Sequence, residues 1–176
     1  MNALYTVALP TLTAADAAFI DSVRAEHDAH SRSMLPAHFT LLFACTAVLE
    51  DVYRTHVGTV AASHPAIEFT CRYAMASPTA SERRAYVYLV PDEGLSAISL
   101  LHDALYAGVM APHLQPEPAF TPHITLAAVA STAEAQRIAT SLNARGLEIH
   151  GTISELRVGS VGESAFVYHA SFPLQP

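Results

Sequence analysis

Two short stretches, Pro36-Ala37-His38-Phe39-Thr40-Leu41 and Pro122-His123-Ile124-Thr125-Leu126, carry the pattern that decides the fold. In an extended chain, side chains two positions apart point to the same face. The His and Thr of each stretch therefore share one face, and the apolar residues beside them turn to the other face, where a helix can cover them. Each stretch predicts a strand with one polar working face and one packed face.

The elements around the two stretches follow one order. The first half predicts, in turn, a strand over 3–9 closed by Pro10, a helix over 14–27, an irregular stretch over 30–36, the His strand over 38–43, a helix over 48–62 and a strand over 67–75. After a loop at 77–82, the second half predicts a strand over 85–90 closed by Pro91, a helix over 93–109, a Pro-rich loop over 112–122, the His strand over 123–127, a helix over 132–144 and strands over 149–158 and 165–172.

This shared order indicates an internal duplication, because the two His strands stand at matching places. It predicts an α+β fold with two pseudo-symmetric, duplicated αβ lobes that face one another. No Gly/Ser-rich or charged linker separates the sequence halves, about 1–80 and 81–176. We therefore expect residues 1–176 to form a single bilobal domain.

The composition limits the class of protein. The chain has 176 residues, of which 51% are hydrophobic, so it can bury a core and is not a disordered tail. The formal net charge is −7, and all nine cations are Arg, which argues against a strong grip on long nucleic acid. No apolar run is long enough to span a membrane, and no signal-peptide pattern opens the sequence. Cys45 and Cys71 are interpreted as reduced core residues. A cytoplasmic protein is the default expectation, and we expect a monomer.

The stretches 38–43 and 120–127 resemble the paired signatures of the 2H phosphoesterase superfamily, which includes the 2′-5′ RNA ligase-like proteins. The resemblance implies two αβ lobes with a cleft between antiparallel sheets, acting on cyclic phosphates or 2′-5′ linkages without a metal. It implies that His38 and His123 are the catalytic pair and that Thr40 and Thr125 hold the phosphate. Some relatives bind nucleotides without clear turnover.

The chemistry of these residue types agrees with the resemblance. Opening a 2′,3′-cyclic phosphate needs a base to activate water and an acid to protonate the departing oxygen. Two imidazoles, each with an ordinary pKa of about 6.5, can hold opposite protonation states near neutral pH. Threonine hydroxyls can donate to the non-bridging oxygens as charge builds up. The sequence does not say which His is the base.

Other polar and aromatic residues are candidates for contact with the substrate. We expect Arg32, Tyr88 and Phe120 to touch it, and Arg83 and Arg84 lie beside loops that should border the cleft. We expect no cofactor and no metal site. His27 and His30 have helical i, i+3 spacing, but no acidic or Cys cluster completes a metal site, and a solvated helix end is the better interpretation. A third, looser His-x-Thr pattern begins at His150 and is interpreted as chance.

The sequence therefore predicts a metal-independent phosphodiesterase that hydrolyses a 2′,3′-cyclic or 2′-5′ linked nucleotide, with a small phosphorylated molecule or an RNA end as its partner. Three alternatives stay open. One is a nucleotide-binding module with the same cleft and no useful turnover. Another is RNA end joining, the reverse reaction, and the last is an interaction protein in which the cleft is disused.

Overall fold

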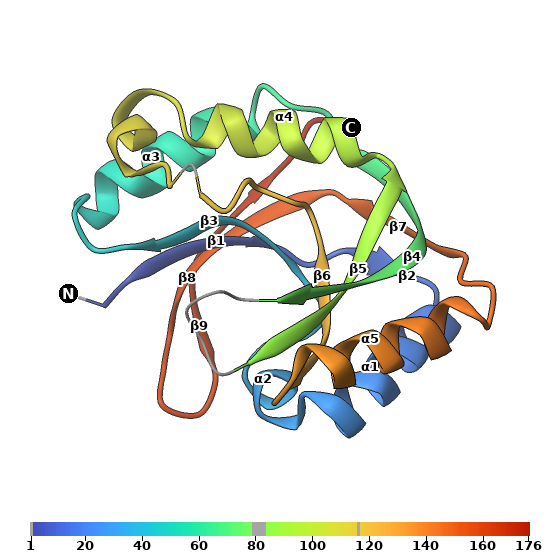
Figure 1. The fold of residues 1–176 in the computed structure, drawn as a ribbon. Coiled ribbons are helices and arrows are strands. Elements are labelled where there is room, and N and C mark those ends of the chain that lie inside the picture. The colour runs from blue at the N-terminus through green and yellow to red at the C-terminus, as the bar shows by residue number, and fades with distance from the viewer. Residues whose placement is uncertain (1, 79–83, 116) are drawn as a thin grey trace.

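Two antiparallel sheets with helices packed on them make up the protein, as Figure 1 shows for a computed structural model that describes residues 2–78, 84–115 and 117–176. The strands are β1 (Leu4–Ala8), β2 (Thr11–Leu12), β3 (Phe39–Cys45), β4 (Ile67–Pro78), β5 (Ala85–Glu93), β6 (Ile124–Val129), β7 (Ile149–Ile153), β8 (Glu155–Val161) and β9 (Phe166–Pro173). The helices are α1 (Ala14–His27), α2 (Ala29–Met34), α3 (Glu50–Ala61), α4 (Leu95–Leu105) and α5 (Thr132–Asn143), with a 3₁₀ helix, η1, over Gly108–His113.

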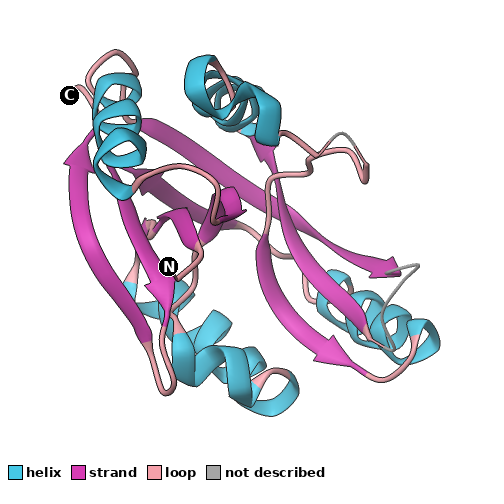
Figure 2. Cartoon of the chain, turned by 90° about the vertical axis from the view of Figure 1, so that its left-hand side faces the viewer, coloured by secondary structure: helices cyan, strands magenta, loops and turns pink. Residues whose placement is uncertain are grey.

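The strand order reveals the duplication. One sheet has the order β3-β1-β8-β9 and the other has the order β2-β7-β4-β5-β6. In the first sheet β1 pairs with β3 and β8, and in the second β5 pairs with β6 and β4, all antiparallel. Each sheet thus combines strands from both sequence halves, and the two curved sheets appear separately in Figure 2 with helices flanking them. The predicted α+β class with duplicated, antiparallel lobes is confirmed.

Local sequence signals set the ends of the elements. Thr13 caps α1, because its Oγ1 accepts a hydrogen bond from the Asp16 amide at 3.1 Å. The helix ends where the Asp28 amide donates to the Arg24 carbonyl at 2.8 Å. Along β5, the alternation of buried Ala85, Val87 and Leu89 with less buried neighbours marks a strand that has one packed face.

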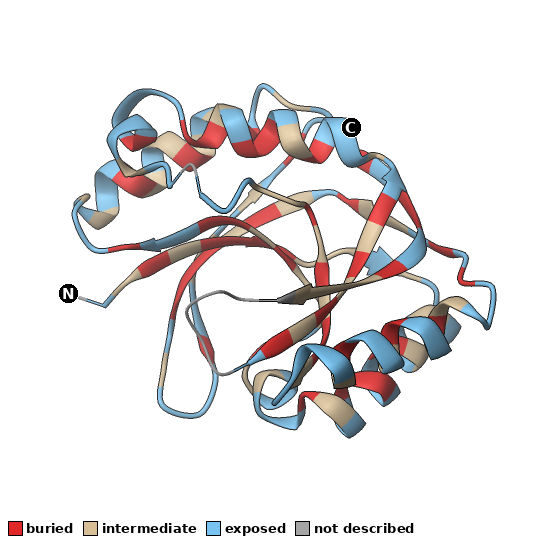
Figure 3. Ribbon diagram, viewed as in Figure 1, coloured by how far each residue is buried: buried red, intermediate tan, exposed pale blue. Residues whose placement is uncertain are grey.

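One continuous apolar core joins both sheets to the helices that cover them. Phe39 of β3 meets Phe69 of β4 edge to face, with ring centroids 5.1 Å apart, so the two sheets contact each other directly. The buried residues form stripes on the inward faces of the helices in Figure 3. No helix among the described residues is long and apolar enough to cross a membrane.

Four predictions of secondary structure were wrong in detail. The stretch over 30–36 was expected to be irregular, but most of it is α2, because Arg32 donates its amide to the Asp28 carbonyl and its guanidinium grips Asp21 of α1. The predicted strand over 149–158 is two strands, β7 and β8, which belong to different sheets. β5 does not stop at Pro91 but continues to Glu93, since a register shift in the pairing with β4 accommodates Pro91.

The predicted helix over 93–109 was too long. The helix α4 occupies only Leu95–Leu105, and η1 begins at Gly108, whose backbone is left-handed with φ of 54°. A glycine adopts this conformation without strain, so the chain can turn here from the end of α4 into η1.

Candidate active site

The two His-x-Thr strands lie at the edges of their sheets. β3 is the outermost strand of one sheet, and β6 is the outermost strand of the other. His38 and His123 each occupy the residue immediately before these strands. The two imidazoles are close enough for the charge of His123 to lower the pKa of His38. The fold therefore brings together two histidines that are 85 positions apart in the numbering.

Both histidines are held by the same main-chain contact. The Nδ1–H of His38 donates to the Pro36 carbonyl at 2.7 Å, and the Nδ1–H of His123 donates to the Thr121 carbonyl at 2.7 Å. In each case the acceptor lies two residues before the histidine. This bond selects the neutral tautomer that carries its lone pair on Nε2. Each ring therefore presents Nε2 as the atom available for proton transfer.

The surrounding protein disfavours the charged form of both rings. Burial lowers the pKa of His38 to about 4, against the opposing effect of the Pro36 carbonyl, and the charges of Arg24 and His123 lower it further. Burial also lowers the pKa of His123, while the hydrogen bond to the Thr121 carbonyl raises it. A phosphate dianion or monoanion between the rings would raise both values, because an opposite charge favours the protonated form.

Each threonine lies on an edge strand, opposite a residue of the strand next to it in the sheet. Thr40 is paired with Val7 of β1, and Thr125 is paired with Tyr88 of β5. The Tyr88 ring stacks on His123 with centroids 3.7 Å apart and planes at 22°. Because paired residues share a face, this stack places Thr125 and His123 on the same side of the sheet. Both threonines are partly exposed, so their hydroxyls are accessible to a ligand.

The three further residues expected to touch the substrate have different surroundings. Tyr88 lies against His123, as described above. Phe120 stacks on His102 of α4, with ring centroids 3.7 Å apart and planes at 6°. The Arg32 guanidinium makes two hydrogen bonds of 2.7 Å to the Asp21 carboxylate, and this pairing commits it to the contact between α1 and α2. Tyr88 is thus the one of the three that contacts a predicted catalytic residue.

Sequence reasoning missed Arg24. Its side chain is buried, and its Nη2 donates to the Leu35 carbonyl at 2.8 Å. The sequence does hold a signal for it: Arg24 is four positions after Ile20 and next to Val23, so it falls on the apolar stripe of α1. A cation on a core-facing stripe needs a specific partner.

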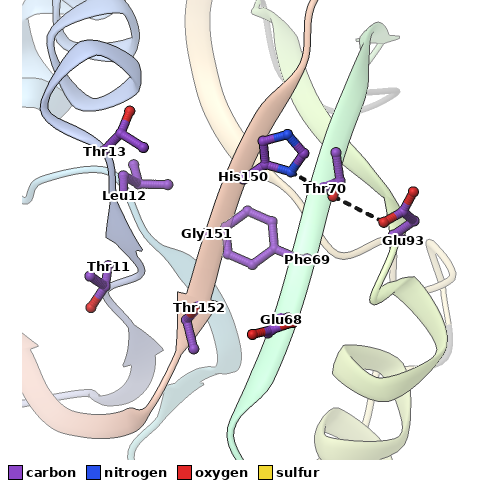
Figure 4. A pocket seen from close by; sticks show the side chains of 10 residues that line it. All are labelled: Thr11, Leu12, Thr13, Glu68, Phe69, Thr70, Glu93, His150, Gly151 and Thr152. Atoms are coloured by element: carbon purple, nitrogen blue, oxygen red, sulfur yellow. Dashed lines mark hydrogen bonds between the residues drawn. The ribbon is translucent and has the colours of Figure 1, made fainter.

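The remaining histidine motifs lie elsewhere. The Thr70 hydroxyl donates to Glu93 at 3.1 Å and accepts from the Nδ1–H of His150 at 3.1 Å (Figure 4). These residues line a cavity of about 540 Å³, whereas His38, Thr40, His123 and Thr125 do not. His27, His30 and the exposed Arg84 line a second cavity of about 420 Å³.

Within the described part of the chain, no group of three His, Cys, Asp or Glu is arranged to hold a metal. Arg83 lies outside the described residues.

The fold defines a class: proteins with two duplicated antiparallel sheets, each of which carries one His-x-Thr strand at its edge. A family model described as the 2′-5′ RNA ligase superfamily matches residues 12–164, and the chain belongs to this superfamily. The expected resemblance to the 2H phosphoesterases is thereby confirmed.

Solved structures show the same fold at low sequence identity. LigT of E. coli, crystallised with 3′-AMP, is 18% identical, with a TM-score of 0.63 and 99% of both chains covered. The protein TT0787 of Thermus thermophilus is 15% identical, with a TM-score of 0.60 and 98% of both chains covered. Usb1 of Kluyveromyces marxianus is 11% identical, with a TM-score of 0.55 and 98% of both chains covered. No curated protein sequence matches the chain.

Proposed function

We propose that this protein is a metal-independent phosphodiesterase that opens a 2′,3′-cyclic phosphate or cleaves a 2′-5′ linkage of a small nucleotide. The observation that supports it best is the matched pair of Nδ1 contacts, 2.7 Å each, which leave Nε2 of both His38 and His123 available for proton transfer. Two such imidazoles supply the acid and the base that the reaction requires.

The proposed reaction is hydrolysis of one P–O bond. One imidazole takes a proton from water through Nε2 as the water oxygen bonds to phosphorus. The bond from phosphorus to the 2′ or 3′ oxygen breaks, and the second imidazole, protonated at Nε2, gives that oxygen its proton. The hydroxyls of Thr40 and Thr125 donate to the non-bridging oxygens, where negative charge grows in the transition state. The product is a nucleoside monophosphate.

The substrate we favour is small. With a net charge of −7 and nine cations, the protein has little means of neutralising many phosphates along a nucleic acid. A single phosphate between two imidazoles and two hydroxyls needs no such surface. The E. coli structure contains 3′-AMP, a molecule of the size that we propose for the product here.

The proposal is tested by phosphorus NMR of 2′,3′-cyclic AMP incubated with the protein in EDTA. We expect conversion to one monophosphate regioisomer, and we expect the His38→Ala/His123→Ala protein to lose it. His150→Ala is the matched control, because His150 belongs to the third His-x-Thr pattern and hydrogen-bonds to Thr70 instead.

The negative outcomes separate the alternatives. Binding of 3′-AMP by folded protein without conversion of any cyclic or 2′-5′ linked substrate would favour a nucleotide-binding module. Formation of a 2′-5′ linkage from RNA ends would favour end joining. Activity that survives removal of both imidazoles would contradict the mechanism.

A further inference from the structure

We propose that Arg24 is a positioning residue that makes His38, and not His123, the base of the reaction. The inference rests on the proposed function and goes beyond it, because the motif itself leaves the two histidines equivalent. It concerns a side chain on helix α1, outside both His-x-Thr strands.

Arg24 is hydrogen-bonded to the backbone segment that orients His38. Its side chain is only 2% exposed, and its Nη2 donates to the Leu35 carbonyl at 2.8 Å. The next carbonyl along the chain, that of Pro36, accepts the Nδ1–H of His38 at 2.7 Å. The guanidinium therefore fixes the peptide segment from which the imidazole takes its orientation. The planar fork of arginine suits this contact, because it bonds to a carbonyl in a defined direction.

Arg24 also acts on His38 through its charge. Its burial leaves Nε without a hydrogen-bond partner among the described residues, so water does little to screen the guanidinium. After burial of the ring itself, the charges that lower the pKa of His38 are those of Arg24 on α1 and His123 beside β6. The charged groups that act on Arg24 in turn are Asp28, Asp21 and Arg32. A neutral His38 with its lone pair on Nε2 is the form that can take a proton from water.

Among the described residues, no equivalent cation acts on the histidine of the second half. The residue three positions before His123 is Phe120, which corresponds to Leu35 in the first half. The ring of His102 on α4 stacks on Phe120, with ring centroids 3.7 Å apart. The causes that shift the pKa of His123 are its burial and its bond to the Thr121 carbonyl, with no arginine among them. The surroundings of the two histidines thus differ: the charge of Arg24 acts on His38, and no arginine is among the causes that shift the pKa of His123. This difference assigns the base to His38 and leaves His123 to give the proton to the leaving oxygen.

The test compares Arg24→Met, which removes the charge and the donors, with Arg24→Lys, which keeps the charge. Arg54→Met is the matched control, because Arg54 is a partly exposed arginine on α3 that is 3.9 Å from Glu50. The first measurement is a ¹⁵N NMR titration of the histidine rings, with the His38 signal assigned from its absence in His38→Ala. The second is the pH–rate profile with 2′,3′-cyclic AMP.

In Arg24→Met we expect the pKa of His38 to rise by about one unit, as follows when a neighbouring like charge is removed. The acid limb of the rate profile should move to higher pH by the same amount, because His38 must be neutral to act. Turnover at pH 7 should fall about tenfold, since the orientation of the imidazole is also lost. Arg24→Lys should keep the acid limb in place, and Arg54→Met should change neither measurement.

Two results would overturn the proposal. One is an Arg24→Met protein, folded by circular dichroism, in which His38 titrates as in the wild type. The other needs no variant: a His38 in the wild-type protein that titrates at or above its ordinary pKa of 6.5. If the wild type shows no phosphodiesterase activity, the proposed function fails, and the NMR titration still tests the action of Arg24 on His38.

Discussion

The two His-x-Thr strands share a motif and a main-chain contact, but their surroundings differ. In the first half, a buried guanidinium holds the backbone before His38. In the second half, aromatic rings lie beside the motif: Tyr88 stacks on His123, and His102 stacks on Phe120. The comparison teaches that a duplicated motif can keep its geometry while the electrostatics of its two copies diverge. A reaction that needs one acid and one base requires that kind of difference.

The largest expected effect on activity follows from removing each imidazole in turn. We expect His38→Ala and His123→Ala each to lower turnover of 2′,3′-cyclic AMP by about 10²–10⁴-fold, because each takes away one proton-transfer group. Imidazole added to the buffer should restore part of the activity. A variant that keeps near wild-type turnover would show that the two copies are not equally required.

The threonines test whether both halves hold the phosphate. Thr40→Val and Thr125→Val each remove one hydroxyl donor while keeping the shape of the side chain. We expect each to lower kcat by about 10²-fold, with a smaller effect on KM, if the hydroxyls act mainly on the charge of the transition state. Serine at the same positions should recover most of the loss, and failure of serine to do so would point to a packing role.

The stacking of Tyr88 on His123 is tested by replacing Tyr88. Tyr88→Leu removes the stack on His123, and a contact of this kind contributes about 0.5–1.5 kcal/mol. We therefore expect a fall in turnover of up to about tenfold, with no change in the titration of His38. Tyr73→Leu on the neighbouring strand β4, where Tyr73 is 55% exposed, is the control. Equal losses in the two variants would argue against a specific role for the stack.

The smallest expected effect is on stability. The pKa of His38 is about 4 in the folded protein, below the ordinary 6.5 that the unfolded chain has. The unfolded state therefore binds the proton first, and the free energy of unfolding falls as the pH drops from about 6.5 toward about 4.

The measurement is urea unfolding at pH 7 and pH 5 of the wild type and of His38→Ala. We expect the wild type to lose on the order of 1 kcal/mol more than the variant, a value reduced from the full linkage because the ring keeps some contact with solvent. Equal pH dependence in both proteins would mean that His38 is not held neutral.

Much of the fold could be predicted because it depends on local patterns. The helix over 14–27 has its predicted bounds in α1, where Thr13 supplies a cap and Ile20 and Val23 supply a buried stripe. The His strands were found within two residues, since apolar alternation and the preceding prolines mark them. Helix α2 was missed because it depends on a contact with another element, the pair of hydrogen bonds between Arg32 and Asp21.

The sequence by itself determined the order of elements, the duplication and the pair of His-x-Thr strands, because these follow from the spacing of residues along the chain. Tertiary structure alone decided that 149–158 divides between two sheets, since no local sequence signal marks Ser154 as the point where the chain passes from β7 to β8. It also decided that a buried arginine of α1 reaches the carbonyl of Leu35, eleven positions away. Charges act through space, so the difference between His38 and His123 arises only when the chain is folded.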